Sequence, residues 1–495
     1  MNFVQNFPFL SIILSLSGGV VCSVLSGKKA RYYLLFVLGA IFLMSSMTLS
    51  FVLETQSSYV YLMGHFTAPW GNEIRVGVLE CLMASLFSLV MILSLSGGLH
   101  HIEEDVEQPK ENLYYTMISL LTSSLLALIY TNDLFTGYVF VEINTIASCA
   151  LVMVRYRSKK ALVATLRYLI MSLLGSGLFL IGICILYDIT GHLLMESIST
   201  AVNHLLATKT YLFPLAVVTT LFSLGLAIKS ACYPFHTWLP DAHGNATVTS
   251  SSVLSGLVLK GYIFLLIKIF YRVLGLNIIF EAKALNILFV FGILAMLYGS
   301  YKAMREKDLK RMLAYSSVAQ VGYIYCGIGL GTTAGFTAAC FQMIVHAVTK
   351  PMLFISTGGF MDVSNGSKKF KDLKGAGRRD LVSGIAFVVG SLSMIGIPFF
   401  AGFGTKVYLS NAAIELASAK MFITLIALAI STLLNACYYI PAMFTLFASS
   451  ENETKAHYSK MYLFSILMFI GLNFIVGLNS EQIYTWIVQG MSMFR

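Results

Sequence analysis

Charged residues are scarce in this sequence. Asp, Glu, Lys and Arg together make up 11% of its 495 residues, whereas soluble domains contain about 25%. The eight cysteines are scattered and include no CxxC pair, which argues against a disulfide framework, a zinc site and an iron–sulfur cluster. We therefore expect the cysteines to behave as small buried hydrophobic residues, and the chain to hold no metal and no cofactor.

Apolar residues, by contrast, dominate the chain. They make up 57% of it and recur in runs of about twenty residues, the length that crosses about 30 Å of hydrocarbon. Membrane-spanning barrels would show alternation every second residue, but stretches such as 174–186 are apolar on all sides. The sequence therefore predicts an all-α polytopic membrane protein of about fourteen transmembrane helices. The predicted spans are 5–25, 33–53, 77–97, 113–131, 134–154, 163–187, 211–233, 249–271, 285–304, 312–331, 335–359, 382–409, 420–447 and 460–480.

The basic residues gather in alternate connectors. The chain carries a net charge of +10, but this excess lies between spans, so it indicates topology rather than a nucleic-acid partner. The positive-inside rule predicts that these connectors are cytoplasmic and that both termini lie outside. We expect the membrane to be the plasma (inner) membrane. The first apolar run lacks a basic segment ahead of it, which favours a first span over a cleavable signal peptide. The basic connectors contain Lys28, Lys29 and Arg31; Arg155, Arg157, Lys159 and Lys160; Lys302, Arg305, Lys307, Lys310 and Arg311; and Lys368, Lys369, Lys371, Lys374, Arg378 and Arg379.

A few ionisable residues lie inside the predicted spans. A lysine at the centre of a spanning helix costs about 2.5–3.5 kcal/mol, so such residues normally pair, face the interior and mark an ion path. A buried lysine that loses its partner releases its proton, because desolvation favours the neutral amine. We therefore predict a proton path built from these residues, in which His346 and Lys350 share one helix face. The candidates are Glu142, Lys229, Lys260, His346, Lys350 and Lys406.

Other polar residues have two interpretations. Lys268 and Glu80 lie near the ends of their spans, where we expect them at the membrane interface, with Lys268 extending to water. His236, Asp241 and His243 fall in the connector after span seven, either as surface groups or as part of proton uptake. Pro234 and Pro398 predict helix breaks near Lys229 and Lys406, since proline removes a backbone hydrogen bond.

Four sequence segments carry a family resemblance. They are KSACYPFHTWLPDAHGNATVTSSSVLSGLVLK (229–260), DLKRMLAYSSVAQVGY (308–323), HAVTKPMLFISTGG (346–359) and SMIGIPFFAGFGTK (393–406). They resemble the proton-translocating antiporter-like subunits of Mrp-type sodium/proton antiporters above all, and also those of complex I and of membrane-bound energy-converting hydrogenases. Two positions depart from the family pattern: Thr247 stands where proline is usual, and Pro351 follows Lys350.

The resemblance implies an organisation and a set of roles. It implies an N-terminal three-helix segment (1–110), two inverted five-helix repeats (111–275 and 280–450), each with a discontinuous helix, and a last span with a short tail (451–495). Glu142 and Lys229 would form the charge pair of the first half channel, and Lys260 the central relay. His346 and Lys350 would lead to Lys406, and the connector with His236, Asp241 and His243 would take up protons from the cytoplasm.

Three functions remain open at this point. The chain is a subunit of a cation/proton antiporter or of a membrane-bound hydrogenase, which we favour; a proton-pumping subunit of a complex I-like NADH or ferredoxin dehydrogenase; or a scaffold without transport. Each implies a lipid bilayer and other membrane subunits as partners, with redox subunits if the complex is a hydrogenase or a dehydrogenase. The transporting candidates carry protons, with sodium as a possible second cargo. Since the chain has no ligand set for haem, flavin, nickel or iron–sulfur, we expect no redox catalysis in it.

Overall fold

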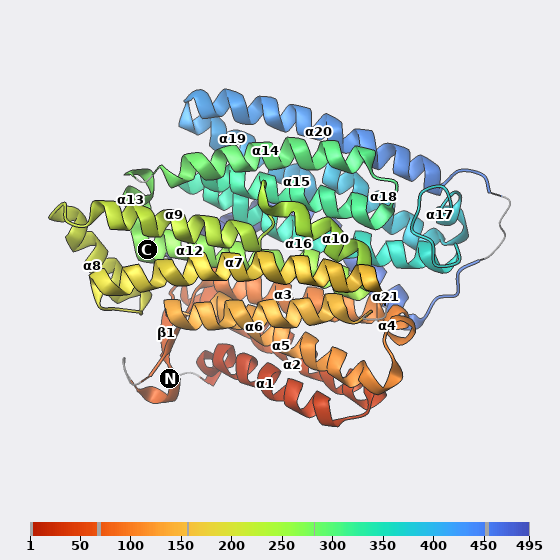
Figure 1. Ribbon diagram of the computed structural model, residues 1–495, viewed down its shortest axis with the longest axis horizontal. Coiled ribbons are helices and arrows are strands. Elements are labelled where there is room, and N and C mark those ends of the chain that lie inside the picture. The colour runs from red at the N-terminus through yellow and green to blue at the C-terminus, as the bar shows by residue number, and fades with distance from the viewer. Residues whose placement is uncertain (1–2, 67–70, 156–157, 282, 451–454, 495) are drawn as a thin grey trace.

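Long helices lie side by side along the long axis of the molecule (Figure 1). The computed structural model describes residues 3–66, 71–155, 158–281, 283–450 and 455–494, so Arg157 of the second basic connector lies outside the described residues. Within these ranges the only sheet is a two-stranded hairpin of β1 (Tyr59–Leu62) and β2 (Glu73–Val76). The predicted all-α polytopic fold is confirmed.

Each predicted span corresponds to a helix. Twelve helices in the described ranges are long and apolar enough to cross a membrane. The remaining two predicted spans are the more polar helix α15 and a discontinuous pair, α18 and α19. The spanning elements are α1 (Phe7–Val24), α2 (Gly27–Thr55), α3 (Val78–Gly97), α5 (Glu111–Tyr130), α6 (Leu134–Met153), α7 (Lys159–Thr190), α9 (Leu212–Lys229), the unit α11–η5–α12–η6 (Val248–Leu274), α14 (Ala284–Arg305), α15 (Leu309–Leu330), α16 (Thr333–Asp362), α18 (Leu381–Ile395) with α19 (Ala401–Leu416), α20 (Ala419–Leu446) and α21 (Lys460–Leu478).

Short helices fill the connections, and sequence periodicity did not predict them. One of them, α22, follows the last span and packs against α3 and α16. The short elements are η1 (Phe3–Asn6), η2 (Met63–His65), α4 (Leu99–Asp105), η3 (Gln108–Lys110), α8 (Met195–Ala207), η4 (Phe235–Thr237), α10 (Trp238–Asn245), α13 (Gly275–Glu281), α17 (Ala376–Arg379) and α22 (Ser480–Ser492).

Side-chain caps start several of the spanning helices. Asp133 accepts a hydrogen bond from the Thr136 amide at the start of α6, and Asp308 and Thr332 do the same for α15 and α16. The first amides of a helix have no partner within it, and an Asp or Thr side chain supplies one. Such partners matter more in a membrane protein, because the bilayer core has no water to bind unpaired amide groups.

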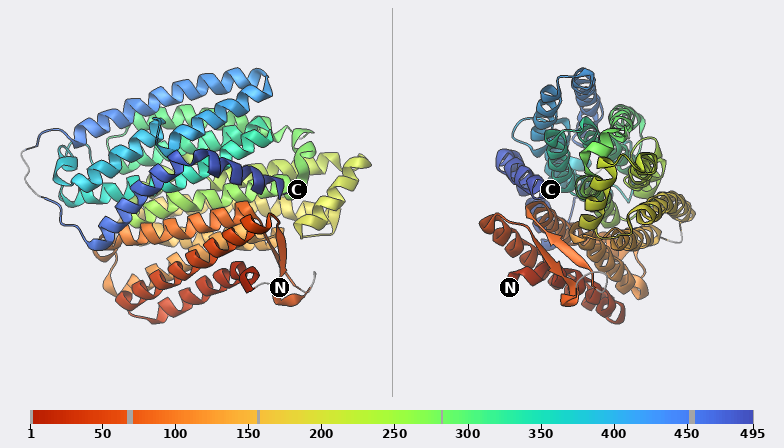
Figure 2. Two further views of the ribbon diagram at one scale, coloured as in Figure 1. Left: turned by 180° about the vertical axis from the view of Figure 1, so that it is seen from behind. Right: turned by 90° about the vertical axis from the view of Figure 1, so that its left-hand side faces the viewer.

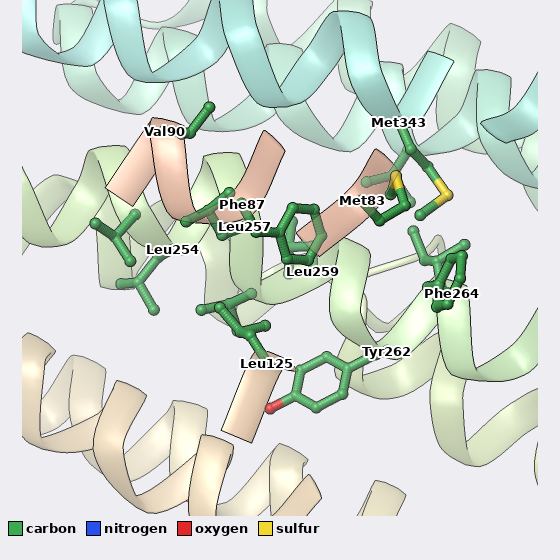
Figure 3. Close-up of a cluster of buried hydrophobic side chains, with 14 of the residues drawn as sticks. Met83, Phe87, Val90, Leu125, Leu254, Leu257, Leu259, Tyr262, Phe264 and Met343 are labelled. Carbon is green, nitrogen blue, oxygen red and sulfur yellow. The ribbon is translucent and has the colours of Figure 1, made fainter. Parts of the chain in front are cut away.

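Two elements form the interior of the bundle. All residues in the most apolar windows of Val248–Leu274 and α16 are buried, compared with 28% for the peripheral helix α21. Side chains of α3, α5, η5, α12 and α16 meet in one apolar cluster that includes Phe87, Leu257 and Met343 (Figure 3). The ionisable residues of α12 and α16 therefore lie in the least accessible part of the molecule.

Two helices are discontinuous near the predicted prolines. Helix α9 ends at Lys229, and the chain passes Pro234 before α10 begins at Trp238. Likewise, α18 ends at Ile395 and α19 begins at Ala401, with Pro398 between them. Gly396 has φ +94°, and a Cβ there would collide with the side chain of Lys406, so only glycine fits this break. The repeat boundaries at 111–275 and 280–450 stay predictions.

The basic connectors lie at one end of the bundle. Both termini lie at one end with the β-hairpin, and α4 and α17 lie at the other (Figures 1 and 2). Ion pairs gather the basic connectors at the α4 end, joining Arg31 to Glu103 (2.5 Å), Arg155 to Asp105 (3.2 Å) and Lys368 to Asp308 (3.4 Å). Connectors predicted to share one face of the membrane thus share one end of the structure.

Candidate functional site

Lys229 is the last residue of α9, and it is 1% exposed. Its Nζ donates a hydrogen bond of 2.5 Å to the hydroxyl of Thr145 on α6 and lies 5.4 Å from the ring centre of Tyr262. Glu142 lies one turn before Thr145 on α6, and its carboxylate is the acid whose charge acts on Lys229. The structure therefore brings the predicted partners into electrostatic range, although within the described residues Lys229 contacts Thr145 and not Glu142 directly.

Lys260 lies on α12 (Leu259–Ile269) and is fully buried. It follows directly after η5 (Leu254–Val258), a π-helical segment, and its ammonium donates to the backbone carbonyl of Ser255 in that segment. A π-helical turn disturbs the regular i→i−4 hydrogen bonding. The carbonyl of Ser255 thus serves as a hydrogen-bond partner for a fully buried ammonium.

The two departures from the family pattern are both accommodated here. Thr247 accepts a hydrogen bond of 3.0 Å from the Ser250 amide and so caps α11 (Val248–Val253). Pro351 lies inside α16, which continues through it. Its ring packs on Gly256 of η5, where a Cβ would come within 2.5 Å of Pro351 Cγ. The glycine of the π-helical segment thus makes room for the proline ring.

Four buried bases form a cluster in the interior, which we call the basic cluster: His243, Lys260, His346 and Lys350. Each is fully buried. The charged groups that act on His243 and His346 are all basic, and Lys350 is the charge that acts on Lys260. Neither ring nitrogen of His243 or His346 has a hydrogen-bond partner among the described residues. Because like charges repel strongly in a dry interior, these groups cannot all be protonated together.

A series of hydrogen bonds leads from Lys350 toward Lys406, and we call it the Lys350–Lys406 series. Lys350 donates to the carbonyl of Leu313 (2.9 Å) and to the hydroxyl of Tyr439 (3.3 Å). At the far end, Lys406 donates to the hydroxyls of Tyr323 (3.0 Å) and Thr432 (2.9 Å). Between these ends the contacts run in order through Tyr439, Ser316, Tyr438, Asn435 and Tyr323.

The members of this series differ in what they can do. The hydroxyls of Ser316, Tyr438 and Tyr439 can each donate and accept a proton, whereas the amide of Asn435 only offers separate donor and acceptor atoms. Asn435 accepts from Tyr438 (2.8 Å) and donates to Tyr323 (3.4 Å). It therefore holds the two tyrosines in place rather than passing a proton itself.

The connector after α9 is buried, not exposed. His236 is 3% exposed and packs between Tyr233 and Tyr298. The ring of His243 stacks on that of Phe354, with 4.9 Å between the ring centres. The interpretation of these histidines as surface polar groups is therefore wrong, because α10 is packed between α7 and α15. Asp241 is the partly exposed member, paired with Arg167 (2.5 Å) and Arg311 (2.7 Å).

Lys310 is a residue of this region that sequence reasoning missed. It lies among the basic connector residues of the sequence, yet it is 2% exposed and its Nζ donates to the carbonyl of Ala246 at 2.6 Å. Its charge acts on His243. Nothing in the basic run distinguishes Lys310 from its neighbours, since only the packing of α15 against α10 turns it inward.

Lys268 and Glu80 are also buried, which corrects the expectation that they lie at the interface. Both are fully buried, and Glu80 pairs with Arg272, which is 4% exposed. Lys268 donates to three backbone carbonyls at the end of α5, those of Leu128 (3.1 Å), Ile129 and Thr131 (2.9 Å). The last carbonyls of a helix lack partners within it and favour a cation. Lys260, Lys268 and Arg272 are spaced by multiples of four residues. This spacing is the feature of the sequence that could indicate a shared, inward-facing side of the helix.

Lys268→Ala should therefore destabilise the protein rather than leave it unchanged. It would leave buried carbonyls without a donor, each costing about 1–3 kcal/mol. We expect a clearly lower thermal stability of the purified protein in detergent, measured by intrinsic fluorescence or by loss of the monodisperse species on heating. Lys283→Ala, an exposed lysine of the same end of the bundle, is the control. Equal stability of the two variants would contradict the capping role.

The fold and this interior together define a polytopic membrane protein with ionisable residues along its core. A family model described as "NADH:quinone oxidoreductase/Mrp antiporter, TM" matches residues 131–435. The chain is 30% identical over 445 residues to NADH-quinone oxidoreductase subunit N of Desulforudis audaxviator, covering 88% of this chain and 85% of that protein. The chain belongs to this family of antiporter-like membrane subunits, found in Mrp and complex I-like complexes.

Two solved structures share the fold. A chain of an archaeal respiratory complex, the membrane-bound sulfane sulfur reductase, superimposes with a TM-score of 0.89 at 23% identity and covers 100% of this chain and 98% of its own. A chain of the Mrp complex from Dietzia sp. DQ12-45-1b gives 0.87 at 22% identity, covering 99% and 97%. These likenesses establish the architecture over the whole chain.

Proposed function

We propose that this chain carries protons across the membrane, through Lys229 and Lys260 to Lys350 and Lys406. The basic cluster is the observation that carries the proposal. It holds four bases in a fully buried space, and the charges that act on its two histidines are all basic. A site of this kind holds fewer protons than it has bases, so the arrival of one proton drives the departure of another.

Glu142 supplies the control of this site. Its carboxylate lies within electrostatic range of Lys229, and a change in the distance between them would alter whether Lys229 keeps its proton. A proton released from Lys229 would add positive charge near Lys260. The two lysines are linked through α12, which carries Lys260 and also Tyr262, whose ring lies beside Lys229. The Lys350–Lys406 series then offers the way out through the second half of the bundle. Its hydroxyls pass the proton on either side of Asn435, and a water molecule would have to carry it past the Asn435 amide.

The proposed orientation follows from charge. The end that carries the basic connectors faces the cytoplasm of a cell whose plasma membrane holds the protein, and both termini face outward. Protons then enter beside Asp241 and α10, where His236, His243 and Lys310 lead inward. The two inverted repeats at 111–275 and 280–450 would each contribute one half of the path.

Glu142→Ala should abolish proton transport while the complex stays assembled. Without the carboxylate, no acidic group on α6 balances the charge of the buried Lys229 ammonium. Transport is measured in inside-out vesicles by quenching of a pH-sensitive dye, and assembly by size-exclusion chromatography. Glu142→Asp, which keeps the charge, should retain part of the transport. Normal transport by Glu142→Ala in an assembled complex would refute the assignment.

The favoured setting is an Mrp-type cation/proton antiporter or a complex of the membrane-bound hydrogenase kind. The likeness to the Mrp complex and to the sulfane sulfur reductase supports both. The relation to NADH-quinone oxidoreductase subunit N supports a complex I-like pump as the alternative. A scaffold without transport is the remote third candidate, and the buried bases argue against it because they are expensive to insert.

Affinity purification of the native complex followed by mass spectrometry separates these settings. Co-purifying iron–sulfur and hydrogenase or dehydrogenase subunits would place the chain in a redox-driven pump. Small hydrophobic subunits alone would place it in an antiporter driven by ion gradients. A dependence of the transport assay on external Na⁺ would add sodium as a second cargo.

A further inference from the structure

Helix α4 carries an acidic run at an end of the molecule where the other connectors are basic. Its sequence is LHHIEED (Leu99–Asp105), with Glu103, Glu104 and Asp105 at its C-terminus. Glu103 and Asp105 pair with Arg31 and Arg155. Glu104 instead faces His100, one turn earlier on the same helix, at 3.2 Å. The proton path described above uses none of these residues.

Three potential metal ligands converge beside α4. A ring nitrogen of His100 and carboxylate oxygens of Glu104 and Asp362 all lie within 4.8 Å of one another. Asp362 is the last residue of α16, so the group joins two helices that are distant in sequence. An i, i+4 pair on a helix presents both side chains to one point, and small side-chain rotations bring the third ligand to bonding distance.

His101 forms a second, buried part of this arrangement. It is 5% exposed, and its Nε2 lies 3.0 Å from Oδ1 of Asp362. Its ring lies against Gly358 of α16, where a Cβ would come within 2.6 Å of the imidazole. A side chain at 358 would therefore displace the ring. His101 thus orients the carboxylate of Asp362, as polar neighbours of metal-binding carboxylates do.

The group opens into a cavity of about 500 Å³. Besides His100, His101 and Asp362, the cavity is lined by Glu103, Asp380 and His457, the last from the segment before α21. Glu103 and Asp380 already have partners in Arg31 and in Ser383 and Tyr458, so the lining offers the imidazole of His457 as a further ligand and room for water to complete a coordination shell.

We propose that this site binds a divalent transition-metal cation, with Zn²⁺ as the best fit, through His100, Glu104 and Asp362. Imidazole nitrogen together with carboxylate oxygens favours zinc and its neighbours over Mg²⁺ and Ca²⁺, which take oxygen ligands only. A bound ion would tie α4 to the end of α16, the helix that carries His346 and Lys350. The proposal is independent of proton transport, because it rests on binding at residues outside the path.

Metal titration of the purified complex tests the site. After treatment with a chelator and its removal, the complex is titrated with Zn²⁺ by calorimetry and with Co²⁺ by visible absorption. We expect His100→Ala and Glu104→Gln each to weaken Zn²⁺ binding by more than about 100-fold. His101→Ala, which removes only the orienting group, should weaken it by about tenfold. Mg²⁺ should not compete at millimolar concentration.

The control is His204→Ala, an exposed histidine of α8 at the opposite end of the bundle, which should bind as the unmodified complex does. Zinc bound by other subunits contributes equally to every variant, so the difference between the isotherms of two variants reports this site alone. Loss of one Zn²⁺ equivalent in His100→Ala and Glu104→Gln, with a folded complex by size-exclusion chromatography, supports the proposal. Identical isotherms for His100→Ala and the unmodified complex would overturn it, as would the absence of saturable Zn²⁺ binding.

Discussion

Lys406→Ala should abolish proton transport without dissociating the complex. Lys406 is the end of the Lys350–Lys406 series, where its ammonium is bound to the hydroxyls of Tyr323 and Thr432. Removing a positioned proton carrier lowers a rate by about 10²-fold or more. The measurement is dye quenching in inside-out vesicles that contain equal amounts of assembled complex.

Two further variants show whether the loss comes from proton transfer. Lys406→Arg keeps the positive charge, but arginine does not give up its proton in proteins; it should be as inactive as Lys406→Ala. Lys420→Ala removes a half-buried lysine that donates to the carbonyl of Gly329 (2.7 Å) and lies outside the series. It should transport normally. Transport by Lys406→Arg at the unmodified rate would show that Lys406 acts only as a fixed charge.

Arg272→Met should lower the stability of the protein more than any variant of the proton path. It would leave the carboxylate of Glu80 buried without its ion-pair partner, and breaking a buried pair from one side costs about 3–5 kcal/mol. Arg272 also lies over the ring of Phe494 at 4.4 Å, so the C-terminal contact would be lost as well. The expected result is a marked drop in yield of assembled protein and in the midpoint of thermal unfolding.

The double variant Glu80→Gln/Arg272→Met provides the decisive comparison. The double variant contains neither the carboxylate nor the guanidinium, so no unpaired charge is left buried. Its stability should therefore recover in part relative to the single variants. Glu80→Gln alone would leave Arg272 unpaired and should resemble Arg272→Met. If the double variant were as unstable as the sum of the two single variants, the pair would not be coupled, and the loss would reflect packing alone.

The helices and the candidate path could be predicted from sequence because lipid imposes simple requirements. A span must be apolar for about twenty residues, so the positions of α1, α3 or α16 follow from composition. A charge in such a run is expensive and therefore conspicuous, which is how Lys260 and Lys350 were found. Proline and glycine likewise indicated discontinuities beside Lys229 and Lys406.

Which side of a helix faces the interior could not be predicted in the same way. Lys268 and Lys310 look like interfacial or connector lysines, but both are buried, because neighbouring helices cover them and backbone carbonyls bind their ammonium groups. Hydropathy measures how apolar a segment is and contains no information on which neighbour it meets. The same limit hid the His100–Glu104–Asp362 group, whose third ligand comes from a distant helix.

The sequence by itself thus determined that the chain lies in lipid, the positions of its spans, the breaks at two helices and three of the buried lysines, Lys229, Lys260 and Lys350. These depend on local composition and on the free energy of transfer into lipid. The tertiary structure alone decided the partners: Thr145 for Lys229, the carbonyl of Ser255 for Lys260, and the tyrosine and serine hydroxyls between Lys350 and Lys406. Partners of this kind are fixed by how helices far apart in sequence pack, since each buried polar group must find a donor or acceptor among whichever neighbours the fold supplies.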